Sequence, residues 1–192
     1  MPRTIVITGC STGFGYDAAL RFARNGDRVY ATMRGVDGKN QGPAGELRQA
    51  AADEGIDIRV LEMDVSSDAS VNAAAETVLA ESGAPYAVIN NAGQMYMGLT
   101  EAFTADELAW QLDVNVVGIH RVNRAFLPAM REKGDGVVIN VSSIAGRFGA
   151  PLFGVYHASK WAVEGYSPGC RTQLASAGVD MPVAAPVPRL PA

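Results

Sequence analysis

Tyr156 and Lys160 stand four positions apart in the stretch VYHASKWAVEG, and their side chains are of types that can exchange protons with a substrate. Residues at i and i+4 share one face of a helix, so the Lys160 ammonium group is expected beside the Tyr156 phenol. A free tyrosine has a pKa near ~10, too high for ready proton exchange at neutral pH. A neighbouring positive charge favours the phenolate and so indicates a general acid or base. For an isolated pair, a surface Tyr and Lys without function is the alternative.

A glycine-rich segment, TGCSTGFG, follows the first apolar run of the chain and contains Gly9, Gly13 and Gly15. Glycine lets the backbone approach a pyrophosphate closely, and the start of the following helix offers unpaired N–H donors. An ordinary strand-to-helix turn is the alternative interpretation. The position after a first strand is the context that a dinucleotide-binding loop requires, so we expect this loop to bind phosphate.

Short β-branched runs alternate with longer helix-favouring stretches along the chain. Strands are predicted at residues 4–8, 28–32, 58–62, 87–90 and 137–141, where the sequence is nearly continuous in apolar residues. Helices are predicted near residues 16–25, 43–54, 70–81 and 105–132, the last with a capping box formed by Thr104 and Glu107. This alternation predicts an α/β fold with a Rossmann-like, doubly wound parallel sheet in three layers. Ligands of such sheets bind at the carboxyl ends of the strands.

Five motifs in this order and spacing resemble the short-chain dehydrogenase/reductase superfamily, in its common rather than its extended subclass. They are the glycine loop, N-N-A-G at residues 90–93, D-V-N-V-V-G around Asn115, Ser142 and Ser143 after the fifth strand, and the Tyr156–Lys160 pair. The resemblance covers residues 4 to about 167. It implies an NADP(H)-dependent oxidoreductase that interconverts a ketone or aldehyde and an alcohol by hydride transfer.

The resemblance also implies roles for individual residues. Tyr156 would act as general acid or base, and Lys160 would lower the pKa of Tyr156 and bind the nicotinamide ribose. Ser143, preferred over Ser142, would hold the substrate oxygen, and Asn115 would order a proton-relay water at an irregularity in the long helix. The residues expected to bind the cofactor are Gly9, Ser11, Thr12, Gly13, Phe14, Gly15, Arg34, Asp64, Val65, Asn91, Ala92, Gly93, Tyr156 and Lys160.

The residues that follow the second strand indicate which nicotinamide cofactor is bound. An acidic residue there usually holds a ribose 2′-hydroxyl, whereas a 2′-phosphate is bound by arginine. The sequence reads ATMRG, with Arg34 and no carboxylate before Asp37. Arg34 can pair with a phosphate through its planar set of donors, or it can be a solvated residue at a strand end. We expect NADP(H) to be preferred, with NAD(H) as the alternative.

Two segments, residues 94–103 and 144–155, are expected to border the reacting end of the cofactor. Their side chains predict an apolar, adaptable wall for a small apolar carbonyl or alcohol, formed by Met95, Tyr96, Met97, Phe148, Leu152 and Phe153. Arg147 is explained by surface exposure as well as by a substrate carboxylate. His157 is expected to be a partly exposed residue that fills space without a role in the chemistry, and His120 is expected to be a structural residue of the long helix.

Composition excludes several other classes of protein. A net charge of −4 argues against a nucleic-acid partner. No apolar run approaches the roughly 20 residues that span a bilayer, and the first residues lack the apolar core of a signal peptide. We therefore expect no membrane partner and a cytoplasmic location. Two cysteines are too few for a disulfide framework, and two histidines without a Cys/His cluster predict no metal site.

The last part of the chain departs from the family pattern. Pro168 and Gly169 predict a kink or an early stop near Ser167 in the helix that begins near Tyr156. The stretch after Gly178 predicts only a poor sixth strand, in which Pro182 fits an edge position or a strand end. We expect one dinucleotide-binding and catalytic domain at residues 1–180, lacking the last strand of the family, and a Pro-rich, poorly ordered tail at residues 181–192.

These departures predict weak or absent turnover, because the family's substrate-covering segment and last strand would be missing. They leave a homo-oligomer possible but weakened, since relatives often pair through the helix that contains Pro168. The alternative function is therefore a catalytically impaired, truncated nucleotide-binding protein.

Overall fold

Five apolar segments form parallel strands where the sequence predicts them, in a computed structural model that describes residues 2–186. The strands are β1 (Thr4–Thr8), β2 (Arg28–Met33), β3 (Ile58–Glu62), β4 (Ala87–Asn90) and β5 (Gly136–Val141). They lie in the order β3-β2-β1-β4-β5, with every neighbouring pair parallel. The strand order reverses between β1 and β4, so their carboxyl ends form the switch point at which ligands bind in such sheets.

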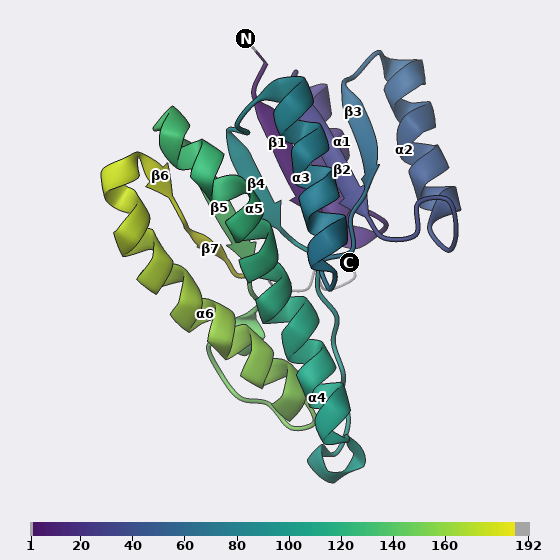
Figure 1. Ribbon diagram of the computed structural model, residues 1–192. Coiled ribbons are helices and arrows are strands. Elements are labelled where there is room, and N and C mark those ends of the chain that lie inside the picture. The colour runs from purple at the N-terminus through teal and green to yellow at the C-terminus, as the bar shows by residue number, and fades with distance from the viewer. Residues whose placement is uncertain (1, 187–192) are drawn as a thin grey trace.

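Helices cover both faces of this sheet, which gives the predicted three layers (Figure 1). They are α1 (Gly13–Arg24), α2 (Gln41–Glu54), α3 (Asp68–Ser82), α4 (Ala105–Leu112), α5 (Gly118–Lys133) and α6 (Gly154–Leu174). Buried side chains of α1 and α2 form one apolar cluster with the sheet. Those of α3 and α5, with the end of α6, form the cluster on the opposite face. The core therefore lies on both sides of the strands, as their unbroken apolar runs require.

The long helix predicted at residues 105–132 is interrupted in its middle. It begins with the predicted capping box, in which Glu107 N–H donates to the Thr104 hydroxyl and the Glu107 carboxylate accepts from Thr104 N–H. A π-helical segment at Asp113–Val117 then separates α4 from α5. Such π segments are frequent at functional sites. The irregularity expected around Asn115 is thus confirmed.

The predicted stop near Ser167 is wrong, because α6 continues through Pro168 and Gly169 to Leu174. Pro168 is exposed, whereas Val163, Ser167 and Leu174 are buried against the rest of the domain. Packing of this buried face therefore maintains the helix although one backbone donor is missing at Pro168.

The stretch after Gly178 is built into the sheet, which corrects the expectation of a poorly ordered segment for residues 181–186. Two short strands, β6 (Val179–Asp180) and β7 (Val183–Ala184), both pair in parallel with β5. Pro182 lies between them, at the edge position predicted for it, and its carbonyl accepts from Asn140 N–H at 3.1 Å. Residues 187–192 of the predicted tail lie outside the described residues. Between residues 2 and 186, the structure has no strand beyond β6 and β7 on this side of the sheet.

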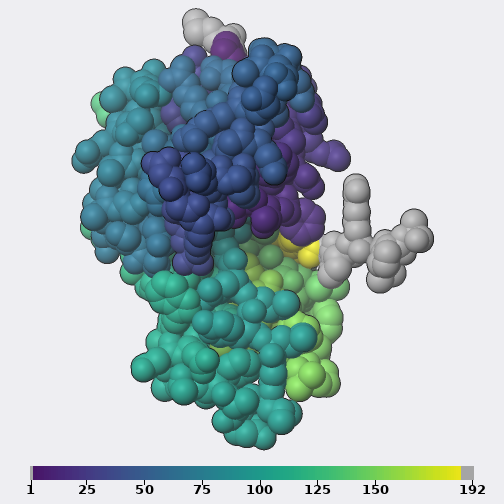
Figure 2. All heavy atoms as spheres, turned by 90° about the vertical axis from the view of Figure 1, so that its right-hand side faces the viewer, coloured from purple at the N-terminus to yellow at the C-terminus, as the bar shows by residue number. Residues whose placement is uncertain are grey.

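Within the described part of the chain, none of the helices combines the length and the apolar character needed to cross a membrane. In Figure 2, the yellow end of the described chain lies between the purple N-terminal elements and the green residues that follow β5. This placement brings Pro186 to the carboxyl edge of the sheet, where the candidate site lies.

Candidate active site

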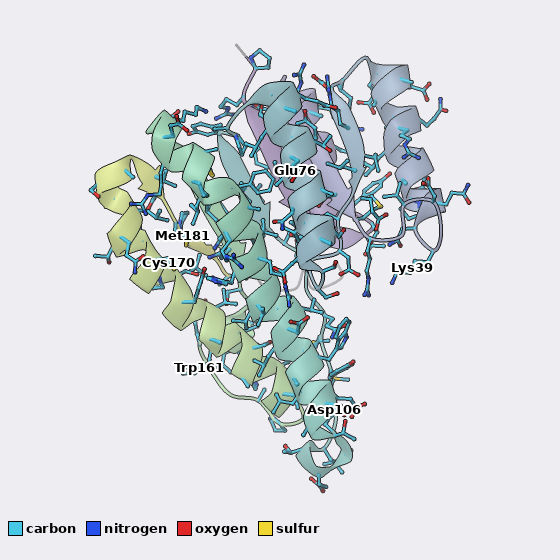
Figure 3. The ribbon with its side chains drawn as sticks, in the orientation of Figure 1. Lys39, Glu76, Asp106, Trp161, Cys170 and Met181 are labelled. Atoms are coloured by element: carbon cyan, nitrogen blue, oxygen red, sulfur yellow. The ribbon has the colours of Figure 1, made fainter. Side chains whose placement is uncertain are left out.

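A cavity of about 430 Å³ opens at the carboxyl ends of β1 to β4 and collects most of the residues expected to bind a cofactor. Its lining includes the predicted residues Gly9, Ser11, Thr12, Arg34, Asp64, Val65, Asn91, Ala92 and Gly93. It also includes Lys39 and Asn40, which sequence reasoning missed. Figure 3 shows Lys39 in the loop between β2 and α2. Two cations, Arg34 and Lys39, therefore line the same cavity.

The glycine loop fits closely against the N-N-A-G segment. A Cβ atom at Gly9 would come within 2.8 Å of the Ala92 Cα atom, and one at Gly15 would collide with the Asn91 side chain. Gly9 and Gly13 also have φ values of +72° and +61°, a region that favours glycine. The Asn91 amide donates to the Thr8 and Gly9 carbonyls at 2.9 and 3.1 Å. The glycine loop is thus fixed against Asn91 and Ala92, and its backbone borders the cavity without side chains at the glycines.

Not every predicted residue lines this cavity. Gly13 and Gly15 contribute to the shape of the loop and are not among the lining residues. Phe14 is 59% exposed and faces a second cavity, of about 550 Å³, around Tyr156. None of these three residues therefore lines the first cavity.

The second cavity brings three of the four predicted catalytic side chains together. Ser143, Tyr156 and Lys160 line it, and it shares Asn91, Gly93 and Gln94 with the first cavity. Lys160 Nζ lies 5.8 Å from the centroid of the Tyr156 ring and donates to the Val141 carbonyl at 2.9 Å. The i, i+4 placement on α6 thus produces the proximity predicted from spacing.

Burial decides the electrostatics of Lys160. Its side chain is 6% exposed, and this desolvation lowers its pKa from 10.5 to about 8. With a pKa of about 8, Lys160 is still charged at neutral pH but releases its proton more readily than a solvated lysine. Lys160 therefore combines a positive charge with a proton that can be exchanged, both beside Tyr156.

The two serines after β5 differ in their surroundings. Ser143 is half-buried, and its hydroxyl accepts from Ala145 N–H at 3.2 Å. The Ser142 hydroxyl is buried without a hydrogen-bond partner among the described residues, and Gly146 lies against it. The more accessible hydroxyl is that of Ser143, the residue preferred from the motif spacing.

Asn115 is not among the residues that line either cavity. Its side chain is fully buried, accepts from Gln94 N–H at 2.8 Å and donates to the Gln94 carbonyl at 2.8 Å. It also donates to the Ser159 hydroxyl at 3.0 Å. Because its amide is occupied in this way, the side chain holds the segment after N-N-A-G in place, next to α6.

The second cavity is lined mainly by apolar groups, but its wall differs from the predicted one. Met95, Phe148 and Phe153 line it as expected, whereas Tyr96, Met97 and Leu152 do not. The Tyr96 ring stacks on Phe103 at 5.9 Å, and Met97 is 58% exposed. Leu152 has a φ of +72°, which is rare for a branched residue, and its side chain is exposed.

The fold and this arrangement of residues agree with comparisons to known proteins. The sequence model of the short chain dehydrogenase family matches residues 3–189. The chain belongs to this family.

Named relatives of this short-chain dehydrogenase support the assignment. The 17-beta-hydroxysteroid dehydrogenase type 1 of Homo sapiens is 40% identical over 185 residues, which cover 94% of this chain and 55% of that protein. The 3-ketodihydrosphingosine reductase of Bacteroides thetaiotaomicron is 39% identical over 166 residues, which cover 86% and 56%. The chain therefore spans about half the length of these curated relatives.

A solved structure of the same family extends the comparison. A metagenomic short-chain oxidoreductase in complex with NADP superposes with a TM-score of 0.88 at 28% identity, over 97% of this chain and 82% of that chain. The likeness in fold therefore extends over nearly the whole of this chain.

Three supporting residues of this short-chain dehydrogenase were missed in the sequence. The Thr8 hydroxyl accepts from the N–H groups of Asn91 and Ala92, at 3.0 and 2.9 Å. Gln111 is fully buried and accepts from Tyr96 N–H at 2.7 Å, while the Ser159 hydroxyl donates to the Tyr156 carbonyl at 2.8 Å. Gln111 precedes Asn115 by one helical turn and Ser159 precedes Lys160 directly, so position relative to the motifs was the available signal.

Proposed function

We propose that this chain binds NADP(H) across the two adjoining cavities and interconverts an apolar ketone or aldehyde with an alcohol. The observation that supports this proposal is the juxtaposition of the two cavities through Asn91, Gly93 and Gln94. One cavity holds two cations at the end of β2, and the other holds Ser143, Tyr156 and Lys160 among apolar side chains. A dinucleotide has the same two parts, a phosphate-bearing adenosine and a reactive nicotinamide.

The residues around the first cavity fit such a cofactor. At Gly93, a Cβ atom would lie 3.2 Å from Asn115 Oδ1 and 3.7 Å from Lys160 Nζ, so a bare backbone adjoins the catalytic lysine. The Glu62 carboxylate accepts from Gly35 and Val36 N–H at 2.8 and 2.7 Å, and these bonds occupy it. Asp64, the carboxylate that lines this cavity, accepts from the Ser66 N–H and hydroxyl groups. Arg34 and Lys39 are the cations in the lining and can pair with a 2′-phosphate, which favours NADP(H) over NAD(H).

The chemistry follows from the groups on α6 and after β5. When bound, the nicotinamide supplies or accepts the hydride at the carbonyl carbon. Tyr156 donates its phenolic proton to the carbonyl oxygen, or accepts it from the alcohol in the reverse direction. Ser143 holds the substrate oxygen by a hydrogen bond, and the Lys160 charge stabilises the phenolate left on Tyr156. Asn115 acts through Gln94, whose backbone it fixes at the boundary of the two cavities.

The substrate class follows from the wall of the second cavity. Met95, Phe148 and Phe153 offer apolar contacts that suit an apolar carbonyl or alcohol better than a small anion. Arg147 is paired with Glu164 at 3.5 Å and is exposed, which favours its surface interpretation. The names of the two relatives refer to a 17-beta-hydroxysteroid and to 3-ketodihydrosphingosine, which is compatible with this class.

A fluorescence titration with NADPH and NADH tests the cofactor part of this proposal. We expect tighter binding of NADPH, and we expect Arg34→Ala to weaken it about 10- to 100-fold while leaving NADH nearly unchanged, since a charge-assisted hydrogen bond contributes about 1.5–3 kcal/mol. Arg124→Ala, at an exposed arginine of α5, is the matched control and should change neither affinity. Equal loss for both nucleotides would contradict the assignment of Arg34 to the 2′-phosphate.

Turnover with an apolar aldehyde tests the catalytic part. Tyr156→Phe should lower the rate at least about 100-fold and leave the NADPH affinity unchanged, because general acid–base catalysis contributes about that much. If the unmodified chain bound NADPH without reducing any apolar carbonyl, the nucleotide-binding alternative would replace the catalytic proposal.

A further inference from the structure

We infer that His157 is a positioning residue, which holds the loop at residues 145–150 as the wall of the second cavity. The inference rests on the proposed function only in taking this cavity as the substrate site. The sequence alone predicts a partly exposed filler, because His157 belongs to none of the motifs. The structure shows instead a half-buried imidazole with both ring nitrogens engaged by the backbone of one loop.

The two hydrogen bonds define the protonation state of the ring. Ala150 N–H donates to His157 Nε2 at 2.8 Å, so this nitrogen must carry a lone pair, and its longer 3.3 Å contact with the Ala150 carbonyl is then not a hydrogen bond. His157 Nδ1 lies 2.6 Å from the Ala145 carbonyl, which can only accept, so Nδ1 must carry the proton. The loop therefore selects the neutral Nδ1–H tautomer. Neither nitrogen is left to exchange a proton with a substrate, which excludes His157 as a second acid or base.

The loop at residues 145–150 lies between Ser143 and Tyr156 in the sequence. Its residues Ala145, Phe148 and Ala150 line the cavity. His157 directly follows Tyr156 on α6, so its ring ties the loop to the helical turn that carries the proton donor. The distance between the apolar wall and Tyr156 is thereby set by two short hydrogen bonds.

Aromatic contacts reinforce this anchoring. The His157 ring lies 6.5 Å from the Phe148 ring and 6.0 Å from the Phe153 ring, both in tilted arrangements. Offset and tilted aromatic pairs of this kind contribute beyond their buried area. The second tie between this loop and α6, the Arg147–Glu164 ion pair, is 3.5 Å long and exposed on the arginine side, so it is the weaker one.

Kinetics of His157→Phe and His157→Gln test the positioning role. The phenylalanine keeps a ring and removes both hydrogen bonds, whereas glutamine keeps one donor and one acceptor. We expect His157→Phe to raise the KM for benzaldehyde about tenfold, with kcat within about threefold and the NADPH affinity unchanged, because misplaced binding groups impair substrate positioning. His157→Gln should recover part of this loss. An unchanged KM in His157→Phe would overturn the inference, and so would a fall in kcat equal to that of Tyr156→Phe.

Two measurements that do not depend on turnover separate failure of this inference from failure of the proposed function. In protein with ¹⁵N-labelled histidine, His120→Gln leaves one imidazole, since the sequence has two histidines. Its ¹⁵N shifts at neutral pH should report a protonated Nδ1 and an unprotonated Nε2. Hydrogen exchange at the Ala150 amide should accelerate at least about tenfold in His157→Phe, since its acceptor is gone. An Nε2–H tautomer, or an unchanged exchange rate of the Ala150 amide, would overturn the positioning role of His157 whether or not the chain reduces carbonyls.

Discussion

At the scale of single residues, the site depends on placing a lysine where its charge is costly. Lys160 is 6% exposed, and its amino group has the Val141 carbonyl as its hydrogen-bond partner among the described residues. Its pKa falls from 10.5 to about 8 because burial disfavours the charged form. Such a destabilising group is expected at a site whose chemistry needs the charge and not in a core that evolved for stability alone.

The pH dependence of stability follows from this shift. Below about pH 8, Lys160 is charged in both the folded and the unfolded chain, so the full burial penalty is present. Between about pH 8 and 10.5 the unfolded chain binds more protons than the folded one, so this group makes stability rise with pH.

We therefore expect Lys160→Met to raise the free energy of unfolding at pH 7 by about 2 kcal/mol. The removed penalty corresponds to about 3 kcal/mol, and the lost hydrogen bond to Val141 offsets about 1 kcal/mol of it. The gain should shrink between pH 7 and pH 9.5 in urea unfolding, while carbonyl reduction is lost. Lys133→Met, at an exposed lysine, is the control and should show no such pH dependence. A less stable Lys160→Met protein at pH 7 would contradict this account.

At the scale of elements, α6 shows tertiary packing overriding a helix-breaking residue. Pro168 lies on the exposed side of the helix and leaves the Glu164 carbonyl without its usual backbone donor. On the buried side, the Ser167 hydroxyl donates to the Val163 carbonyl at 2.8 Å and accepts from the Asn140 amide at 2.9 Å. The contact with Asn140 ties the turn that contains the proline to β5.

Replacing Pro168 by Ala should raise the free energy of unfolding by about 2 kcal/mol. The restored hydrogen bond and relieved clash contribute about 3 kcal/mol, and the greater freedom of the unfolded chain removes up to about 1 kcal/mol of that. Gly169→Ala is a useful comparison, because it is also exposed and should stabilise by only about 0.5–1 kcal/mol. Thermal unfolding of both variants decides the matter, and a destabilised Pro168→Ala protein would mean that packing requires the proline geometry.

At the scale of the whole molecule, the segment at residues 179–186 extends the sheet beside Ser142 and Ser143. Asn140 N–H donates to the Pro182 carbonyl at 3.1 Å, and Ser142 N–H donates to the Ala184 carbonyl at 2.7 Å. Met181 is 1% exposed, and in Figure 3 it lies between α6 and the sheet. On the opposite face of β5, Val137, Ile139 and Val141 remain only partly buried. The stability of the carboxyl end of β5 thus depends on the segment at residues 179–186.

Met181→Ala should therefore lower the free energy of unfolding by about 3 kcal/mol, since it removes a buried side chain from a packed cluster. Met97→Ala is the matched control. Its side chain is 58% exposed, and its removal should change stability by no more than about 0.5 kcal/mol. Urea unfolding of the two variants measures the difference, and equal values would show that the segment contributes nothing to the core.

Features that depend on neighbours within a few positions were predictable from the amino-acid sequence. The strands at residues 4–8, 58–62 and 87–90 match the structure residue for residue, because continuous apolar runs are a local signal. The Thr104 capping box and the approach of Lys160 to Tyr156 were predictable for the same reason, since helical spacing alone sets them.

Features that join distant segments of the chain came from the packed fold. It kept α6 intact through Pro168, paired residues 179–184 with β5, brought Lys39 to the cavity that Arg34 lines, and anchored the loop at residues 145–150 to His157. Each of these depends on hydrogen bonds or burial supplied by elements far apart in the chain or by the backbone of a loop. Local propensity cannot report such contacts, because their free energy exists only once the sheet and its helices are packed together.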